Sequence, residues 1–331
     1  MKAHDRSAFW QRAIPGALVS LIAILALSQM ASWEGVGSAL RALEIWRVLA
    51  ACGLFLLSLV WRALGWRILL GGQVTFRRVF LSMNAGYLLN NLFPFRLGEF
   101  GRAVLMGEHT GKGALHTLST IAIERIFDLT ITAALVLVSL PLVINAAWAQ
   151  SAAVLMFSLS VLGLLILYIA ARTTARWLPA LERVLNRSPR LQTLILPRLR
   201  SILAGFEVLT NPMQFALALL LIALSWGTVI FEHLVLLNGF DSRVQFVWAT
   251  FGLGVAGLGV AIPSAPGALG VMEASVVAAL AVFNVAREPA LAFAILLRLI
   301  YFVFTLIFGL YALASEGETL TDLYRRALNM Q

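Results

Sequence analysis

The chain has 331 residues, of which 60% are hydrophobic and only 12% are charged, and its net charge is +9. A soluble domain normally contains about 25% charged residues, so this composition excludes a water-facing globular protein. The arginines concentrate in short polar stretches between apolar runs, which is typical of cytoplasmic loops and argues against nucleic-acid binding. Cys52 is the only cysteine, which excludes an internal disulfide, and we expect no metal or cofactor.

Two membrane spans are predicted at the start of the chain, over residues 14–32 and 46–70. A basic N-terminal segment precedes the first span, and arginines beginning with Arg62 mark the far end of the second. Because positive residues accumulate on the cytoplasmic side, we assign both basic flanks to the cytoplasm and residues 32–44 to the outside.

The segment 79–106 is apolar but is interrupted midway by a proline and a charged, glycine-containing turn. Such a turn breaks a helix, and irregular backbone survives at membrane depth only when it is buried in protein or lines a wet cavity. We therefore predict a re-entrant pair of half-helices that enters from the cytoplasm and returns to it. The polar and helix-breaking residues of this element are Asn90, Asn91, Pro94, Arg96, Gly98, Glu99 and Arg102.

A long span over 115–144 follows, and a span over 152–171 returns to the cytoplasm. Residues 172–200 then carry seven arginines and a single acid, Glu182, which is the strongest orientation signal in the chain. Apolar residues recur there near helical spacing. They predict either a helix that lies on the anionic inner leaflet or an ordinary solvated loop helix.

The second half contains spans over 215–237 and 289–314, with another broken element, 245–283, between them. This element has two apolar halves around a proline- and glycine-rich break, and we predict that it enters from outside. Its helix-breaking residues are Pro263, Pro266, Gly267 and Gly270.

The predicted fold is an all-α polytopic membrane protein with about six crossing helices and two re-entrant half-helix pairs. A single integral membrane domain covers residues 1–331, with halves 14–171 and 213–314 joined by a basic cytoplasmic loop, 172–212. The charge pattern places both termini in the cytoplasm and the protein in the inner, or cytoplasmic, membrane.

The two broken elements resemble each other in sequence. Pro94–Glu99 and Pro266–Glu273 both read proline, two residues, leucine, glycine and then a glutamate. Opposite entry sides would make them an inverted repeat, and in transporters broken helices at corresponding positions lie at the substrate site near the bilayer midplane. So short a match can also recur by chance.

Ionisable residues fall within the apolar stretches, where each charge costs about 2.5 to 3.5 kcal/mol at the centre of a spanning helix. These residues must therefore pair or face water. One interpretation is a polar slot whose arginines hold a head-group phosphate, and the other is a set of ion pairs that ties the helices together. The expected slot comprises Asn90, Asn91, Arg96, Glu99, Arg102, Glu124, Arg125, Asp128, Glu273 and Arg298.

Three motifs in order resemble the lysylphosphatidylglycerol synthase transmembrane family, the membrane half of the multiple-peptide-resistance factor, which also occurs as stand-alone flippase-like proteins. They are the segment Asn90–Glu99, the set Glu124-Arg125-x-x-Asp128 and the segment Pro263–Glu273. The resemblance covers nearly the whole chain and implies translocation of a phospholipid or glycolipid. Family members often have a glycine pair after the prolines of the third motif, whereas here Ala268 follows Gly267.

The resemblance implies a lipid transporter with no catalytic residues, and too few residues follow Ala314 for an aminoacyl-transferase domain. A membrane-embedded enzyme acting on a lipid and a scaffold for a lipid-modifying partner remain the alternatives. The expected partners are membrane lipids, with a homo-oligomer or a lipid-synthesising protein left open. The lipid, the direction of transport, the energy source and the oligomeric state are not set by the sequence.

Overall fold

The computed structural model describes residues 18–29, 32–93, 97–143, 147–185, 192–193, 195–261 and 264–328, over which all regular structure is helical. Five helices in these ranges are long and apolar enough to cross a membrane. They are α3 (Ile45–Leu69), α6 (Ala114–Val143), the part Gln150–Thr174 of α7 (Ala147–Leu185), α10 (Pro212–Phe240) and α13 (Arg287–Glu316). The helix Leu18–Gln29 bends by 80° into α2 (Trp33–Ala42), and this pair counts as a sixth span if it is taken as one. The predicted all-α polytopic fold is confirmed.

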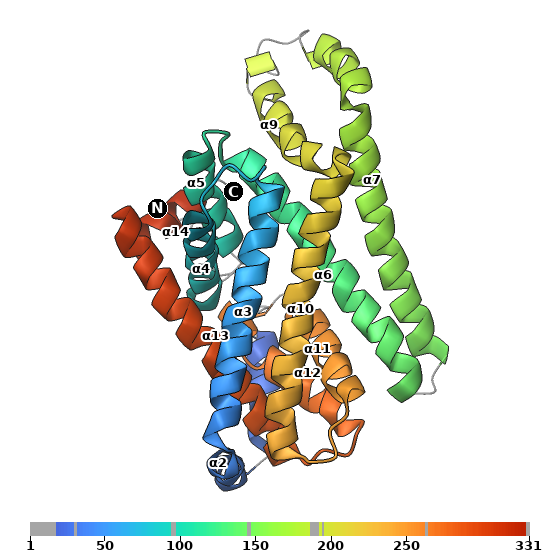
Figure 1. Cartoon of the computed structure of the whole chain (residues 1–331), viewed down its shortest axis with the longest axis vertical. Coiled ribbons are helices and arrows are strands. Elements are labelled where there is room, and N and C mark those ends of the chain that lie inside the picture. The colour runs from blue at the N-terminus through green and yellow to red at the C-terminus, as the bar shows by residue number, and fades with distance from the viewer. Residues whose placement is uncertain are drawn as a thin grey trace.

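Shorter helices occupy the two segments that the sequence predicts to be broken. The first segment forms α4 (Phe76–Leu92) and α5 (Leu97–Thr110), and the second forms α11 (Phe246–Ala261), the 3-10 turn η2 (Pro266–Ala268) and α12 (Val271–Ala281). None of these helices reaches the roughly 20 residues that a crossing needs. The α4–α5 pair lies toward the end of the bundle that also holds α9, whereas α11 and α12 lie toward the end that holds α2 (Figure 1).

The segment predicted as a basic loop is partly helical. Helix α7 continues past the expected end of its span to Leu185, and the Ala, Leu and Arg residues of this extension favour a helix although Pro179 lies inside it. Helix α9 (Leu196–Phe206) then packs against α6 so closely that a Cβ atom on Gly205 would lie 2.6 Å from the carbonyl oxygen of His116. The basic segment is therefore anchored to the bundle through α9.

Two short elements complete the chain around these helices. The 3-10 turn η1 (Glu207–Thr210) leads into α10, whose first backbone N–H groups donate to the side chain of Asn211. Such an asparagine N-cap satisfies donors that would otherwise have no partner. Helix α14 (Leu320–Leu328) follows α13 and packs on α5.

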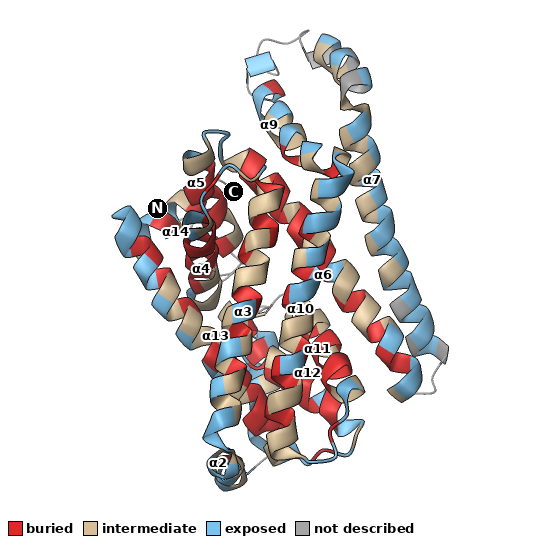
Figure 2. Cartoon of the chain, in the orientation of Figure 1, coloured by how far each residue is buried: buried red, intermediate tan, exposed pale blue. Residues whose placement is uncertain are grey.

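Burial separates an inner layer from an outer one (Figure 2). Helix α4 is largely buried, whereas the apolar span within α7 buries none of the residues whose burial the structure describes. Exposed leucines and isoleucines such as Leu159 and Ile166 cover α7. Exposed apolar surface of this extent is unstable in water and is the surface that lipid tails cover.

Candidate functional site

Ionisable side chains gather where α3, α5 and α6 pack together. Three are arginines and three are carboxylates, so their formal charges cancel. We call this set the charge cluster: Arg62 from α3, Glu99 and Arg102 from α5, and Glu124, Arg125 and Asp128 from α6.

Glu124 lies at the centre of the charge cluster and is fully buried. Its Oε1 atom accepts from Arg62 Nη1 at 3.0 Å and from Arg125 Nη2 at 2.9 Å. Its Oε2 atom lies 2.9 Å from Arg102 Nη2. A buried carboxylate is costly unless it is compensated by opposite charge, and here three guanidinium groups share that role.

Asp128 lies one helical turn after Glu124, so both carboxylates point from the same face of α6. Arg62 donates to its two oxygens, with distances of 2.9 Å from Nη1 to Oδ2 and 2.9 Å from Nη2 to Oδ1. Arg125 Nη1 lies 3.2 Å from Oδ2, and Trp226 of α10 donates its indole N–H to Oδ1 at 2.9 Å. The charge cluster therefore connects four helices.

Arg102 has a different environment from the other two arginines. Its side chain is only 1% exposed, and its guanidinium lies 4.7 Å from the ring centroid of Trp66. The Trp66 indole N–H donates to Thr120 Oγ1 at 3.1 Å, which fixes the ring. Within the described part of the chain, the guanidinium nitrogens of Arg102 have no hydrogen-bond partner, and Glu124 provides only the close opposite charge.

Glycines set the position of Arg102 because α4 and α5 cross at very short range. A Cβ atom on Gly98 would lie 1.7 Å from the carbonyl oxygen of Gly86, and one on Gly86 would lie 3.1 Å from Arg102 Cβ. Gly98 is the second residue of α5, and its backbone N–H donates to Asn90 Oδ1 at 2.8 Å. Gly98 therefore allows close helix contact inside the element that the sequence predicts to be broken.

A second polar group lies at the break between α11 and α12, which we call the second break (residues 264–270). Arg298 of α13 donates from Nη1 to the carbonyl oxygen of Gly267 at 2.8 Å and from Nη2 to that of Ala268 at 3.2 Å. It also pairs with Glu273, which in turn accepts from the backbone N–H of Gly270 at 2.8 Å. This ion pair satisfies backbone groups that a broken helix leaves open.

Positive φ angles in the second break explain its glycines. Gly267 has φ +63° and Gly270 has φ +81°. Ala268 also has a positive φ, +52°, although an alanine adopts this region at a cost. A glycine pair at positions 267 and 268 would therefore suit this backbone.

Asn91, at the C-terminal end of α4, lies between the two polar groups. Its Nδ2 donates to Thr305 Oγ1 of α13 at 2.9 Å, and a Cβ atom on Gly267 would lie 3.3 Å from its Oδ1. Tyr87, one turn earlier on α4, is close enough to interact electrostatically with Arg62. The face of α4 that carries Tyr87 and Asn91 thus runs from the charge cluster to the second break.

The structure brings most of the predicted slot residues into two groups. The charge cluster contains five of them: Glu99, Arg102, Glu124, Arg125 and Asp128. Glu273 and Arg298 form an ion pair at the second break. Asn90 and Asn91 lie on α4 and hydrogen-bond to Gly98 and Thr305. Pro94, Arg96 and Pro263 lie outside the described residues.

Sequence reasoning missed three members of the site. Arg62 was assigned to the cytoplasmic flank of the second span, whereas it lies inside α3 and pairs with Glu124 and Asp128. The sequence pattern assigns no role to Trp66 or Trp226. Arg62 and Trp66 are spaced four residues apart within an apolar helix, and that spacing was the available signal that both face the same neighbour.

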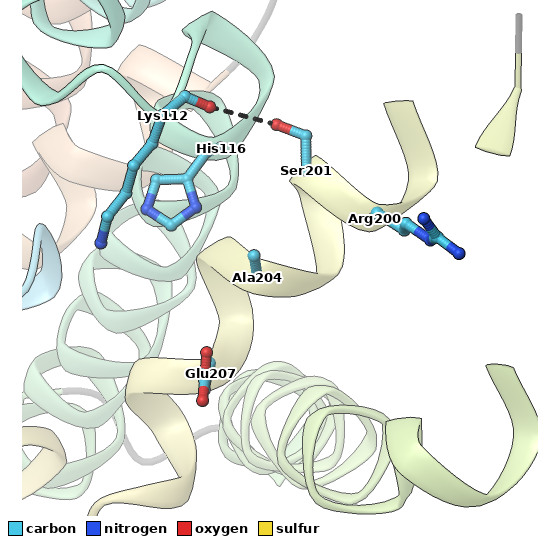
Figure 3. Close-up of a pocket in the computed structure, with 6 residues that line it drawn as sticks. All are labelled: Lys112, His116, Arg200, Ser201, Ala204 and Glu207. Atoms are coloured by element: carbon cyan, nitrogen blue, oxygen red, sulfur yellow. Dashed lines mark hydrogen bonds between the residues drawn. The ribbon is translucent and has the colours of Figure 1, made fainter. Parts of the chain in front are cut away.

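A surface cavity of about 430 Å³ lies between the N-terminal end of α6 and α9 (Figure 3). Arg200 points away from Lys112 and His116 in this view and pairs with Glu182 at 2.7 Å. The cavity is lined by Lys112, His116, Arg200, Ser201, Ala204 and Glu207, none of which belongs to the charge cluster. Over the described ranges, no group of three or more His, Cys, Asp or Glu side chains is arranged to hold a metal ion.

Comparisons with known proteins agree with this architecture. Residues 13–309 match the family described as lysylphosphatidylglycerol synthase TM region, and this range includes both the charge cluster and the second break. A relative, the UPF0104 membrane protein MJ1078 of Methanocaldococcus jannaschii, is 26% identical over 224 residues, which is 67% of this chain and 91% of that protein. The family match fits a lipid-related function in the membrane.

Proposed function

Because the chain belongs to the lysylphosphatidylglycerol synthase TM region family, we propose that it translocates a phospholipid or glycolipid across the cytoplasmic membrane. The head group passes through the charge cluster while the acyl tails stay in the bilayer. One observation carries the proposal: three arginines and three carboxylates meet inside the bundle, at Glu124. Ionisable residues in a membrane are costly and mark transport pathways.

In the proposed topology, α4 and α5 enter from the cytoplasm, and α11 and α12 enter from outside as an inverted repeat of them. Their positions toward opposite ends of the bundle support this arrangement (Figure 1). The contact between Asn91 and Gly267 supports it as well, because two elements that enter from opposite sides can meet only at depth. Both termini are then cytoplasmic, on the side of the arginine-rich segment before α10.

The polar groups provide a path with alternating charge. A head group leaves water at a cost of several kcal/mol for each unpaired charge, and the charge cluster replaces that water with guanidinium and carboxylate groups. The polar face of α4, with Tyr87 and Asn91, continues this path to Arg298 and Glu273. Substrate charge can thus be compensated over much of the crossing.

Reconstitution into liposomes tests the proposal. Wild-type protein is incorporated with a panel of tail-labelled phospholipids and glycolipids, and the fraction of label that a membrane-impermeant quencher reaches is followed over time. We expect faster transfer than in protein-free liposomes, and a loss of about tenfold or more in Asp128→Asn. Asp241→Asn, which removes a carboxylate paired with the exposed Arg243 outside the charge cluster, serves as the matched control and should transfer lipid at the wild-type rate. No transfer of any lipid in the panel by wild-type protein would refute the proposal.

The exact cancellation of charge favours one competing role, in which the ion pairs only hold the helices together. The two roles differ in what a variant changes. If Asp128→Asn lowers thermal stability but leaves the transfer rate of the folded protein intact, the charge cluster is structural. A lower rate at unchanged α-helical content and monodispersity supports a transport path.

A further inference from the structure

Resting on the proposed function, we infer that Arg102 is the receptor for the head-group phosphate. When no lipid is bound, the Glu124 carboxylate occupies the position beside Arg102 that the phosphate would take. The substrate class is then a phosphate-bearing lipid, and a glycolipid without phosphate is excluded.

The first argument is the uncommitted hydrogen-bonding capacity of Arg102. A guanidinium has five N–H donors, and leaving a buried charged donor without an acceptor is costly. Arg102 is 1% exposed, and its Nε, Nη1 and Nη2 atoms have no hydrogen-bond partner among the described residues. A ligand with several acceptor oxygens would remove this cost.

Arg125 donates from Nη2 to Glu124 and lies 3.2 Å from Asp128 through Nη1, and only its Nε has no hydrogen-bond partner among the described residues. Arg62 and Arg298 are more fully committed. Arg62 donates to Glu124 and to both oxygens of Asp128. Arg298 donates to two carbonyl oxygens of the second break and pairs with Glu273. Recruiting either Arg62 or Arg298 for a ligand would break several hydrogen bonds, whereas recruiting Arg102 would replace only its ion pair with Glu124 at 2.9 Å.

The second argument is that Glu124 can release Arg102 without being left unpaired. Arg62 and Arg125 both contact its Oε1 atom, at 3.0 Å and 2.9 Å, while Arg102 contacts Oε2 at 2.9 Å. Removing the sole partner of a buried charge is strongly unfavourable. Here two guanidinium groups would remain on the carboxylate when a phosphate takes the third.

The third argument is the orientation that Trp66 imposes. The guanidinium lies over the Trp66 ring at 4.7 Å, a cation–π contact that holds the planar group by its face. Its N–H edge then remains available for the bidentate contact that guanidinium makes with phosphate oxygens. A sugar hydroxyl lacks the charge and the paired oxygens that this edge fits.

Lipid binding by the detergent-purified full chain separates this inference from transport. The readout is the thermal midpoint titrated with short-chain phosphatidylglycerol, with a short-chain diacylglycerol glycolipid without phosphate, and with inorganic phosphate. We expect the phospholipid alone to stabilise wild-type protein. We expect Arg102→Gln to weaken its apparent affinity about tenfold or more, and Arg102→Lys to weaken it less, because lysine keeps the charge and loses the bidentate geometry.

The matched control is Arg200→Gln, which removes an exposed arginine outside the charge cluster and should leave the affinity unchanged. Unchanged phospholipid affinity in Arg102→Gln would overturn the inference. If that variant does not fold, unchanged affinity in Arg102→Lys overturns it. Equal stabilisation by the glycolipid, which has no phosphate, or by inorganic phosphate, which has no lipid, would also overturn the inference.

Failure of this inference and failure of the proposed function can be told apart. If wild-type protein transfers lipid but the Arg102 variants bind phospholipid normally, the lipid is recognised elsewhere and only the receptor assignment fails. If wild-type protein transfers no lipid while Arg102→Gln loses phospholipid binding, the receptor stands and the transport proposal fails.

Discussion

Asn91 at the end of α4 lies against Gly267 in the second break, with 3.3 Å between Asn91 Oδ1 and a Cβ atom built on the glycine. Arg298 Nη1 lies 3.4 Å from the same Cβ position. The two short-helix elements, far apart in sequence, therefore meet at a point with little room for a larger residue and with hydrogen-bonding groups on both sides.

Gly267→Ala is expected to lower the stability of the protein by about 1 to 2 kcal/mol, the cost of a left-handed conformation for a residue with a Cβ atom. The side chain would also crowd Asn91 and Arg298. The measurement is the thermal midpoint of the purified variant. Gly163→Ala in α7 has no atom within 4 Å of its new Cβ and should be neutral or stabilising, so equal midpoints for the two variants would contradict the geometry.

Ala268→Gly is expected to stabilise the protein. The left-handed φ of +52° costs alanine about 1 to 2 kcal/mol, and glycine removes this cost while adding roughly 0.5 to 1 kcal/mol of lost backbone entropy. The net gain is about 0 to 1.5 kcal/mol and is read as a higher thermal midpoint. Ala279→Gly, inside helix α12, gives the opposite sign because glycine weakens a helix interior. A lower midpoint for Ala268→Gly would show that the backbone at 268 is not left-handed.

Gly98→Ala should prevent α4 and α5 from packing as they do. The new Cβ atom would lie 1.7 Å from the backbone oxygen of Gly86, which cannot move without displacing α4. We expect little monodisperse protein in size-exclusion chromatography. Gly53→Ala in α3, where no atom lies within 4 Å, is the control. Normal yield and normal stability of Gly98→Ala would rule out the close crossing.

Asp128→Asn is expected to destabilise the protein by about 3 to 5 kcal/mol, because it leaves Arg62 and Arg125 with excess buried positive charge. The measurement is the loss of α-helical circular dichroism on heating. Asp241→Asn removes a carboxylate whose partner Arg243 is solvent-exposed, and screening by water makes its effect much smaller. Similar losses in the two variants would mean that the charge cluster is hydrated.

Much of the fold could be predicted from the sequence because span length is a local property. The expected spans 46–70 and 115–144 correspond to α3, Ile45–Leu69, and α6, Ala114–Val143. The proline- and glycine-rich segments likewise mark where the helices are shorter than a crossing needs. The extension of α7 to Leu185 is not predicted by the charge pattern, because charge indicates the end of a span, whereas arginine-rich segments can continue a helix outside the membrane.

The sequence by itself determined the membrane class, the order of the spans and the polar residues that need partners, since apolar run length and the cost of a buried charge depend only on the local chain. Only the tertiary structure decided that Arg62 joins Glu124 and Asp128, that Trp66 lies beneath Arg102, and that Arg298 is used by the backbone of the second break. Which side chains pair with each other depends on which faces of distant helices meet. Helix packing decides this, including the contact of Gly86 with Gly98, and no local sequence pattern specifies that packing.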